Sequence, residues 1–429
     1  MEPDLAWWAA TEIGERVRSG RLDPEAVVAR HLDRIRRLDP RLGAYVHVDG
    51  NARCGSGPLA GVTLAVKDTQ PVAGMPWTYG SRKWRDRVAE QDAIPVARAR
   101  AAGAAVLGKT NTPELAAAVS TVNDLFPPTH NPWRHGTTPG GSSGGSGAAV
   151  AAGLCTIALG DDMGGSIRIP AACCGVAGLR PSPGRVPVEL ADPTGLSVRG
   201  PLARSVADLR LALAVITAEA PPPGRALEGR LRIAVVTESP IPADPACLAA
   251  CERAAEALRE LGHEIEPAGW DPKPVARAYQ VVRPASVSVL PGEPGDYGPA
   301  AARLVAAGRG IAARDYLEAL QSGLTAAAGL RRLLDDHDAI LTPTLGRLPM
   351  PIAEVPPFLQ EAWIAYVQFV LPVSFAGLPA MSLPAGLHQG LPVGVQLVGR
   401  PWGEWPLLDL AEQLEARPGF GFQPPPGWE

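Results

Sequence analysis

Leu159-Gly-Asp-Asp-Met-Gly-Gly-Ser-Ile-Arg-Ile-Pro170 is the stretch that decides most about the fold and the chemistry of this chain. The apolar run 155–159 leads into it and predicts a strand. The glycines before Ser166 let successive backbone N–H groups converge beside a serine hydroxyl, as the binding of an oxyanion requires. The same letters are also typical of a tight turn that caps a short helix, so this stretch alone leaves both interpretations open.

A second glycine-rich stretch, Thr138–Gly147, lies just upstream. Runs of Gly and Ser are usually flexible linkers, but here apolar, structured sequence follows at once. A phosphate-binding loop is disfavoured because no lysine follows the glycines. Residues 141–145 match G-x-S-x-G with Ser143 as the nucleophile, so an α/β-hydrolase elbow served by the late His388 stays an alternative.

A serine nucleophile needs a base, and neither glycine-rich stretch contains a histidine. The chain has only four lysines, and Lys67 directly follows an apolar run, 62–66, that predicts a buried strand. Burial lowers the pKa of a lysine enough for it to act as a base, which an arginine cannot do. A surface pair between Lys67 and Asp68 is the simpler alternative.

Taken together, Val66-Lys67-Asp68, Gly140–Ser146 and Asp162–Arg168 resemble the amidase signature family. Ser142 and Ser166 are 24 residues apart (166 − 142), which is the spacing of that family. Other matching stretches extend the resemblance from about residue 38 to residue 415: 108–111, 131–133, 174–181, 200–204, 342–344, 377–380 and 394–401.

The resemblance implies an α/β fold in which helices surround a mixed central β-sheet. We expect a single amidase domain over residues 1–429. Within it, residues 1–56 supply N-terminal helices, 57–220 form the signature core with the catalytic residues, and 221–429 complete the sheet and the substrate pocket.

The resemblance also implies a Ser–Ser–Lys triad. Ser166 matches the nucleophile, Ser142 matches a bridging serine that the family holds on a cis peptide, and Lys67 matches the base. The oxyanion donors would be the main-chain N–H groups of Met163, Gly164, Gly165 and Ser166. The surrounding residues would be Asp161, Asp162, Ser143 and Arg168.

Asp161 departs from the family, which commonly has Thr at this position. A carboxylate near Lys67 would favour the charged amine and so oppose its action as a base.

The implied activity is hydrolysis of a small acyl or aryl amide, or of a carbamate, without metal or organic cofactor. Residues 125–128 and 279–369 vary within the family, and from them we expect Leu125, Phe126, Trp363 and Tyr366 to shape the pocket; core packing is the alternative. The alternative function is the glutaminase component of a tRNA-dependent amidotransferase, although this chain is somewhat short for it.

Composition sets the remaining expectations. The net charge of −4 gives no general attraction to nucleic acid. Residues 362–399 lack charges, but four prolines interrupt them, so we expect short buried strands instead of a membrane span. The N-terminus has no signal-peptide pattern and the six cysteines have no zinc spacing, which predicts a cytoplasmic protein with free thiols. The expected partner is a small-molecule amide, and a homodimer is an allowed assembly.

Overall fold

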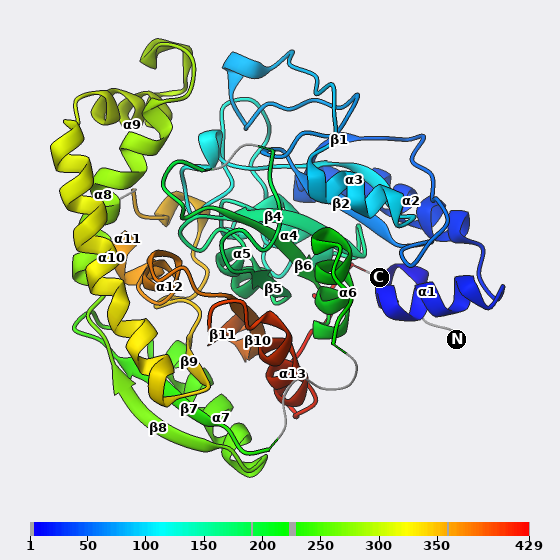
Figure 1. Cartoon of the computed structure of the whole chain (residues 1–429). Coiled ribbons are helices and arrows are strands. Elements are labelled where there is room, and N and C mark those ends of the chain that lie inside the picture. Colours follow the sequence, from blue (N-terminus) through cyan, green and yellow to red (C-terminus); the bar gives the residue numbers. More distant parts are fainter. Residues whose placement is uncertain (1–3, 190–191, 223–228, 358–359, 429) are drawn as a thin grey trace.

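One mixed β-sheet runs through the computed structural model, which describes residues 4–189, 192–222, 229–357 and 360–428. Its strands are β1 (Tyr45–Val48), β2 (Thr63–Lys67), β3 (Ala105–Thr110), β4 (Ile157–Asp162), β5 (Ala177–Arg180), β6 (Val198–Ala203), β7 (Arg232–Glu238), β8 (Glu264–Gly269), β9 (Ala339–Pro343), β10 (Ala380–His388) and β11 (Leu391–Val398). Their spatial order is β1-β3-β2-β4-β6-β5-β10-β11-β9-β7-β8 (Figure 1). The sheet therefore takes strands from all three predicted segments.

Helices cover both faces of this sheet. They are α1 (Ala10–Arg18), α2 (Pro24–Leu42), α3 (Ile94–Ala101), α4 (Gly144–Ala151), α5 (Arg168–Cys174), α6 (Val206–Thr217), α7 (Pro245–Glu260), α8 (Lys273–Ser288), α9 (Pro299–Arg309), α10 (Ala313–Asp336), α11 (Glu361–Val367), α12 (Leu371–Phe375) and α13 (Glu404–Glu415), with a short 3₁₀ turn at Glu114–Ala116. Figure 1 shows α8, α9 and α10 together along one side of the molecule, and α1 and α2 on the opposite side. The predicted fold class, a mixed sheet surrounded by helices, is confirmed.

The strand that carries Lys67 is buried on both faces. All five residues of β2 are buried. Leu64 and Val66 pack on one face in a cluster with α3, α6, α7 and α13, while Ala65 packs on the other face with α2 and α4. An apolar run of this kind is typical of a central strand covered by helices on both sides.

Neighbouring strands fix where the glycine-rich stretches lie. β2 pairs parallel with β4, with Val66 opposite Leu159, and β4 pairs antiparallel with β6. The carboxyl ends of adjacent parallel strands lie at the same edge of a sheet. Lys67, which follows Val66, is therefore brought close to the glycine-rich stretch that follows Leu159.

Two helices have informative ends, and one sequence prediction is only half correct. Helix α2 continues through Pro40 to Leu42, because Gly43 (φ +67°) supplies the left-handed cap that ends it. Helix α4 begins at Gly144, inside the glycine-rich stretch. Between 362 and 399, the first half forms the helices α11 and α12, and only the second half forms strands.

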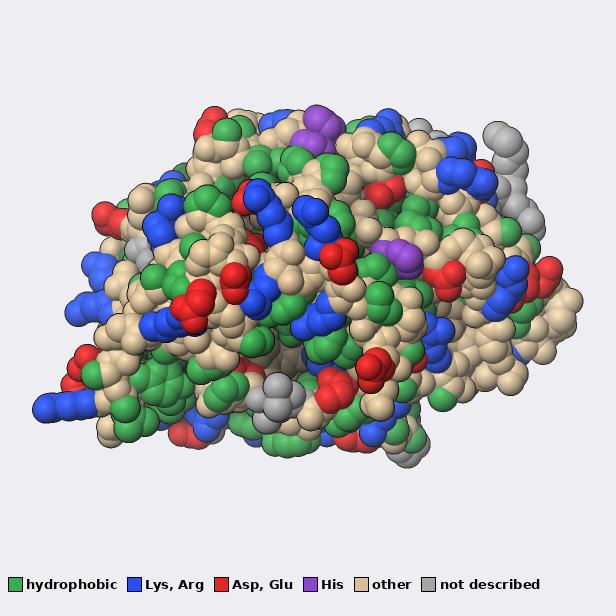
Figure 2. All heavy atoms as spheres, turned by 90° about the horizontal axis from the view of Figure 1, so that it is seen from above, with side chains coloured by type: hydrophobic (Ala, Val, Ile, Leu, Met, Phe, Trp, Pro, Cys, Tyr) green, Lys and Arg blue, Asp and Glu red, His purple; other side chains and the backbone are tan. Residues whose placement is uncertain are grey.

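The outer surface carries charges of both signs. On the face seen in Figure 2, Lys and Arg side chains are interspersed with Asp and Glu side chains instead of being separated by sign. Within the described ranges, none of the helices combines the length and the apolar character that crossing a membrane would need.

Candidate active site

Lys67 lies at the carboxyl end of β2 and is fully buried. Its Nζ atom is 2.6 Å from Ser142 Oγ and 2.5 Å from Asp161 Oδ1. Thr69 donates its hydroxyl hydrogen bond to the other oxygen of the Asp161 carboxylate. The parallel pairing of β2 and β4 thus places the Lys67 amine beside the Asp161 carboxylate, and the loop before α4 adds the Ser142 hydroxyl on the amine.

Two opposing effects act on the pKa of Lys67. Burial, the larger effect, lowers the pKa of the amine, and the adjacent Asp161 carboxylate opposes this by favouring the ammonium form. The pKa remains below its usual value. The site therefore suits a lysine that spends part of a catalytic cycle neutral.

Ser142 belongs to a loop that is tied to the Ser166 turn. The Gly141–Ser142 peptide bond is cis, and α4 begins two residues after Ser142. The next residue, Ser143, donates its backbone N–H to the Ser166 carbonyl at 3.1 Å and its hydroxyl to the Asp161 carbonyl at 3.2 Å. These bonds hold both glycine-rich stretches against the end of β4.

Ser166 lies in the turn between β4 and α5 and is partly exposed. Its hydroxyl forms no hydrogen bond to another described residue, so the structure brings Lys67 and Ser142 together but leaves Ser166 unbonded to Ser142. Catalytic hydrogen bonds are often long without substrate and tighten only in the reactive complex.

Some main-chain N–H groups of the Ser166 turn are already hydrogen-bonded, and others are free to bind an oxyanion. The Gly165 N–H donates to Asp162 Oδ1 at 2.8 Å, whereas the N–H groups of Gly164 and Ser166 have no acceptor among the described residues. Gly165 has φ +117°, and a Cβ atom there would lie 2.5 Å from a methyl carbon of Val370. Glycine is therefore required, and of the predicted oxyanion donors Gly165 is already engaged.

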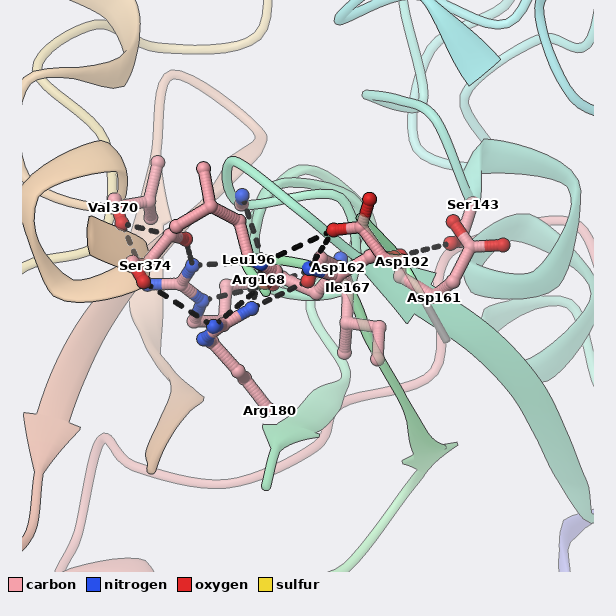
Figure 3. A network of polar contacts seen from close by, with 12 residues as sticks. Ser143, Asp161, Asp162, Ile167, Arg168, Arg180, Asp192, Leu196, Val370 and Ser374 are labelled. Carbon is pink, nitrogen blue, oxygen red and sulfur yellow. Dashed lines mark hydrogen bonds and ion pairs between the residues drawn. The ribbon is translucent and has the colours of Figure 1, made fainter. Parts of the chain in front are cut away.

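Asp162 accepts the Gly165 N–H hydrogen bond and is itself held by ion pairs with two buried arginines. Arg168 donates to both carboxylate oxygens at 2.9 Å, and Arg180 Nη1 lies 3.3 Å from Oδ1. All three side chains are fully buried. Figure 3 shows both guanidinium groups directed at Asp162, with Ser374 also in contact.

The arrangement around Ser143 does not match the α/β-hydrolase elbow. Ser143 is fully buried, and its hydroxyl is bonded to the Asp161 carbonyl, not to a histidine. His388 is exposed at the end of β10. The observed partners of Ser143 are those of a structural residue.

A narrow cavity opens beside Ser166. Trp363 lines it, as do Tyr279 and Arg283, two α8 residues that lie within the variable stretch 279–369 but were not singled out from the sequence. Tyr279 stacks on Trp363 with the ring planes 6° apart. No sequence pattern marks the two α8 residues, because only the packing of α8 against the turn brings them there.

The other predicted pocket residues lie elsewhere. Tyr366 is buried, with its hydroxyl 3.0 Å from Cys173 Sγ, and does not line the cavity. Leu125 and Phe126 are half-buried, and both donate their N–H groups to Asn123 Oδ1. These three residues were predicted to shape the pocket, and the cavity beside Ser166 is formed without them.

Comparison with known proteins shows the family of the chain. The model of the Amidase family matches residues 26–289 and 299–408. AmiB2 of Mycobacterium tuberculosis, named as a putative amidase, is 38% identical over 97% of this chain and 98% of its own length. Indoleacetamide hydrolase of Bradyrhizobium diazoefficiens is 32% identical, covering 96% of this chain and 87% of that protein.

A solved structure of 6-aminohexanoate cyclic dimer hydrolase, complexed with its substrate, superposes with a TM-score of 0.87. It is 30% identical, and the match covers 96% of this chain and 97% of that chain. The chain belongs to the amidase signature family and is a hydrolase of amide C–N bonds.

The contact between Asp161 and Lys67 leads to a first prediction. Asp161→Thr removes a negative charge that favours the ammonium form, so the pKa of Lys67 falls further. On the expectation that Lys67 acts as a neutral base, the acidic limb of the profile of kcat/KM against pH moves to lower pH. Asp338→Asn, which removes a carboxylate that pairs with a surface arginine, is the control and leaves the limb in place. An unmoved limb in Asp161→Thr contradicts the electrostatic role of Asp161.

Proposed function

We propose that this amidase cleaves a small acyl or aryl amide through an acyl-enzyme on Ser166, with Ser142 and Lys67 as the proton relay. The observation that carries the proposal is the 2.6 Å contact between Lys67 Nζ and Ser142 Oγ in a fully buried position. A buried lysine with a lowered pKa that touches a serine hydroxyl is an activated base.

The first half of the reaction forms the acyl-enzyme. Neutral Lys67 takes the proton of Ser142 as Ser142 takes that of Ser166, and Ser166 Oγ bonds to the amide carbonyl carbon. The free N–H groups of the turn hold the developing oxyanion. Ser142 then gives a proton to the departing nitrogen, Lys67 returns one to Ser142, and the C–N bond breaks.

The second half releases the acid. Water occupies the place of the departed amine and loses a proton to Ser142 and Lys67 as its oxygen bonds to the acyl carbon. Collapse of the intermediate breaks the ester bond, returns the proton to Ser166 and leaves the site ready for another turn. A carbamate would follow the same steps, with an alcohol or amine as the leaving group.

Labelling with a fluorophosphonate tests this assignment. The reagent phosphonylates an activated serine, and mass spectrometry is expected to place the adduct on Ser166, within the peptide that contains the Gly164-Gly165-Ser166 turn. Ser166→Ala is expected to abolish labelling, while Ser143→Ala serves as a serine control from the neighbouring loop. An adduct on Ser142 or Ser143 would overturn the assignment.

A glutaminase role remains the second candidate, because this chain is also similar to a component of the glutamyl-tRNA(Gln) amidotransferase of Thermus thermophilus. The two are 36% identical over 92% of this chain and 94% of that protein. Glutamine carries an ammonium group, yet none of the residues that line the cavity is acidic. We therefore favour a stand-alone amidase. Release of ammonia from glutamine, or co-purification with a partner protein, would reverse this preference.

A further inference from the structure

Arg283 is a cation held at the wall of the Ser166 cavity. It projects from α8, its exposed fraction is 9%, and it lines the cavity together with Ser166, Tyr279 and Trp363. It lies on a helix outside the glycine-rich stretches, within the variable stretch 279–369. No sequence pattern gives this residue a role.

The contacts of Arg283 are all with uncharged groups. Nη2 donates to the Leu115 carbonyl at 2.8 Å, and Nη1 donates to Ser286 Oγ at 3.3 Å and approaches Met163 Sδ at 3.4 Å. These three contacts occupy at most three of the five N–H groups of a guanidinium. A thioether sulfur is a weak acceptor, so one of the three is easily replaced.

Arg283 has no carboxylate within ion-pair distance in the part of the chain that the structure describes. The other cations of the site are paired: Lys67 with Asp161, and Arg168 and Arg180 with Asp162. Burial of a charge without a partner is costly, and charged residues are almost never buried unless paired. An anion that binds in the cavity would provide the countercharge that Arg283 lacks.

We propose that Arg283 recognises a carboxylate on the acyl portion of the substrate, so that the enzyme acts on monoamides of short dicarboxylic acids. This inference rests on the proposed function. A guanidinium binds a carboxylate through two parallel hydrogen bonds, a geometry that suits arginine better than lysine. The absence of acidic residues among those that line the cavity favours a simple anion over an amino acid zwitterion.

The acyl portion is the part of the substrate that this cavity suits. The amine leaves first and is replaced by water, so its side of the site needs a path to solvent. The acyl portion stays bonded to Ser166 until water attacks, and it can occupy a narrow space between Ser166 and Arg283. The stacked rings of Tyr279 and Trp363 form an apolar wall against which a short methylene chain can pack.

Two fluorophosphonates of equal chain length, one ending in a carboxylate and the other in its methyl ester, test the proposal. The wild-type enzyme is expected to label at least ~10-fold faster with the carboxylate, in line with hydrogen bonds to charged groups. Arg283→Gln is expected to lose this preference, and Arg283→Lys to keep part of it. Arg277→Gln removes an exposed arginine of the same helix and is expected to keep it in full.

The ratio of the two rates separates recognition from other roles of Arg283. If the arginine only braces α8 or acts on Lys67 through its charge, Arg283→Gln slows both probes by the same factor, the ratio stays at its wild-type value, and the proposal is wrong. Equal rates in the wild type also overturn it, while labelling of Ser166 still supports the amidase mechanism. Absence of any label on Ser166 overturns the mechanism and the inference together.

Discussion

Lys67→Arg is expected to be as inactive as Lys67→Ala, with kcat lowered by about 10³-fold or more, as for the loss of a general base. Arginine keeps the positive charge beside Asp161 but cannot release a proton near neutral pH. The pair of variants therefore separates proton transfer from simple electrostatic support. The measurement is steady-state turnover of any amide substrate, with circular dichroism to show that each variant is folded.

The loss of activity at low pH tests the same role of Lys67. The pKa of Lys67 is lowered by burial, so in the wild type activity is retained as the pH falls until it reaches this lowered pKa, where protonation removes the base. His388→Ala is the control, since this exposed histidine lies outside the proposed triad, and its kcat is expected to stay within a few-fold of wild type. Substantial turnover by Lys67→Arg would show that Lys67 is not the base.

Asp162→Asn is expected to lower the free energy of unfolding by about 3–5 kcal/mol, the usual cost of breaking a buried ion pair. The change leaves Arg168 and Arg180 fully buried without a countercharge. It also weakens the acceptor of the Gly165 N–H, so the Ser166 turn loses its support. Urea denaturation at pH 7 measures the first effect, and the rate of fluorophosphonate labelling measures the second.

Asp338→Asn provides the matched control, since it removes a carboxylate 3.3 Å from a surface arginine, Arg400. Exposed pairs contribute about 0–1 kcal/mol, so this variant is expected to unfold close to wild type. Equal stability of Asp162→Asn and wild type would contradict the anchoring role of Asp162.

The stabilisation of the folded state by Asp162 also depends on pH. Burial alone would raise the pKa of this carboxyl, but the hydrogen-bonded arginines outweigh burial and hold the pKa well below its usual range. The stabilisation is therefore complete above the unfolded-state pKa of about 3.9 and is lost as the pH falls through the lowered folded-state value.

Local sequence was enough to predict the elements that hold Lys67 and Ser166. The apolar runs before Lys67 and before the Ser166 turn form β2 and β4, and the spacing of the glycine-rich stretches indicated the family. The resemblance also anticipated the cis bond before Ser142. These features depend on residues close together in the chain, or on a pattern that many proteins share.

Features that depend on packing between distant parts of the chain could not be predicted from local sequence. The place of Arg283 requires α8 to pack against the Ser166 turn. The contact of Asp161 with Lys67 was expected only through the family resemblance, because it depends on how β2 lies against β4. The charge-free segment 362–399 was predicted as strands throughout, since buried helices and buried strands are both continuously apolar. Tyr366 was chosen for its chemistry, yet its helix turns it toward Cys173.

The parallel register of β2 and β4 has a consequence for how such an enzyme can diversify. Main-chain pairing of residues 64–66 with residues 157–159 holds the two strands side by side, so the side chain at 161 can be exchanged while the backbone that carries Lys67 stays in place. A single substitution there would shift the acidity at which the enzyme works, with no compensating change in the core. Residue 161 is therefore the first site to randomise in directed evolution toward acidic or alkaline media.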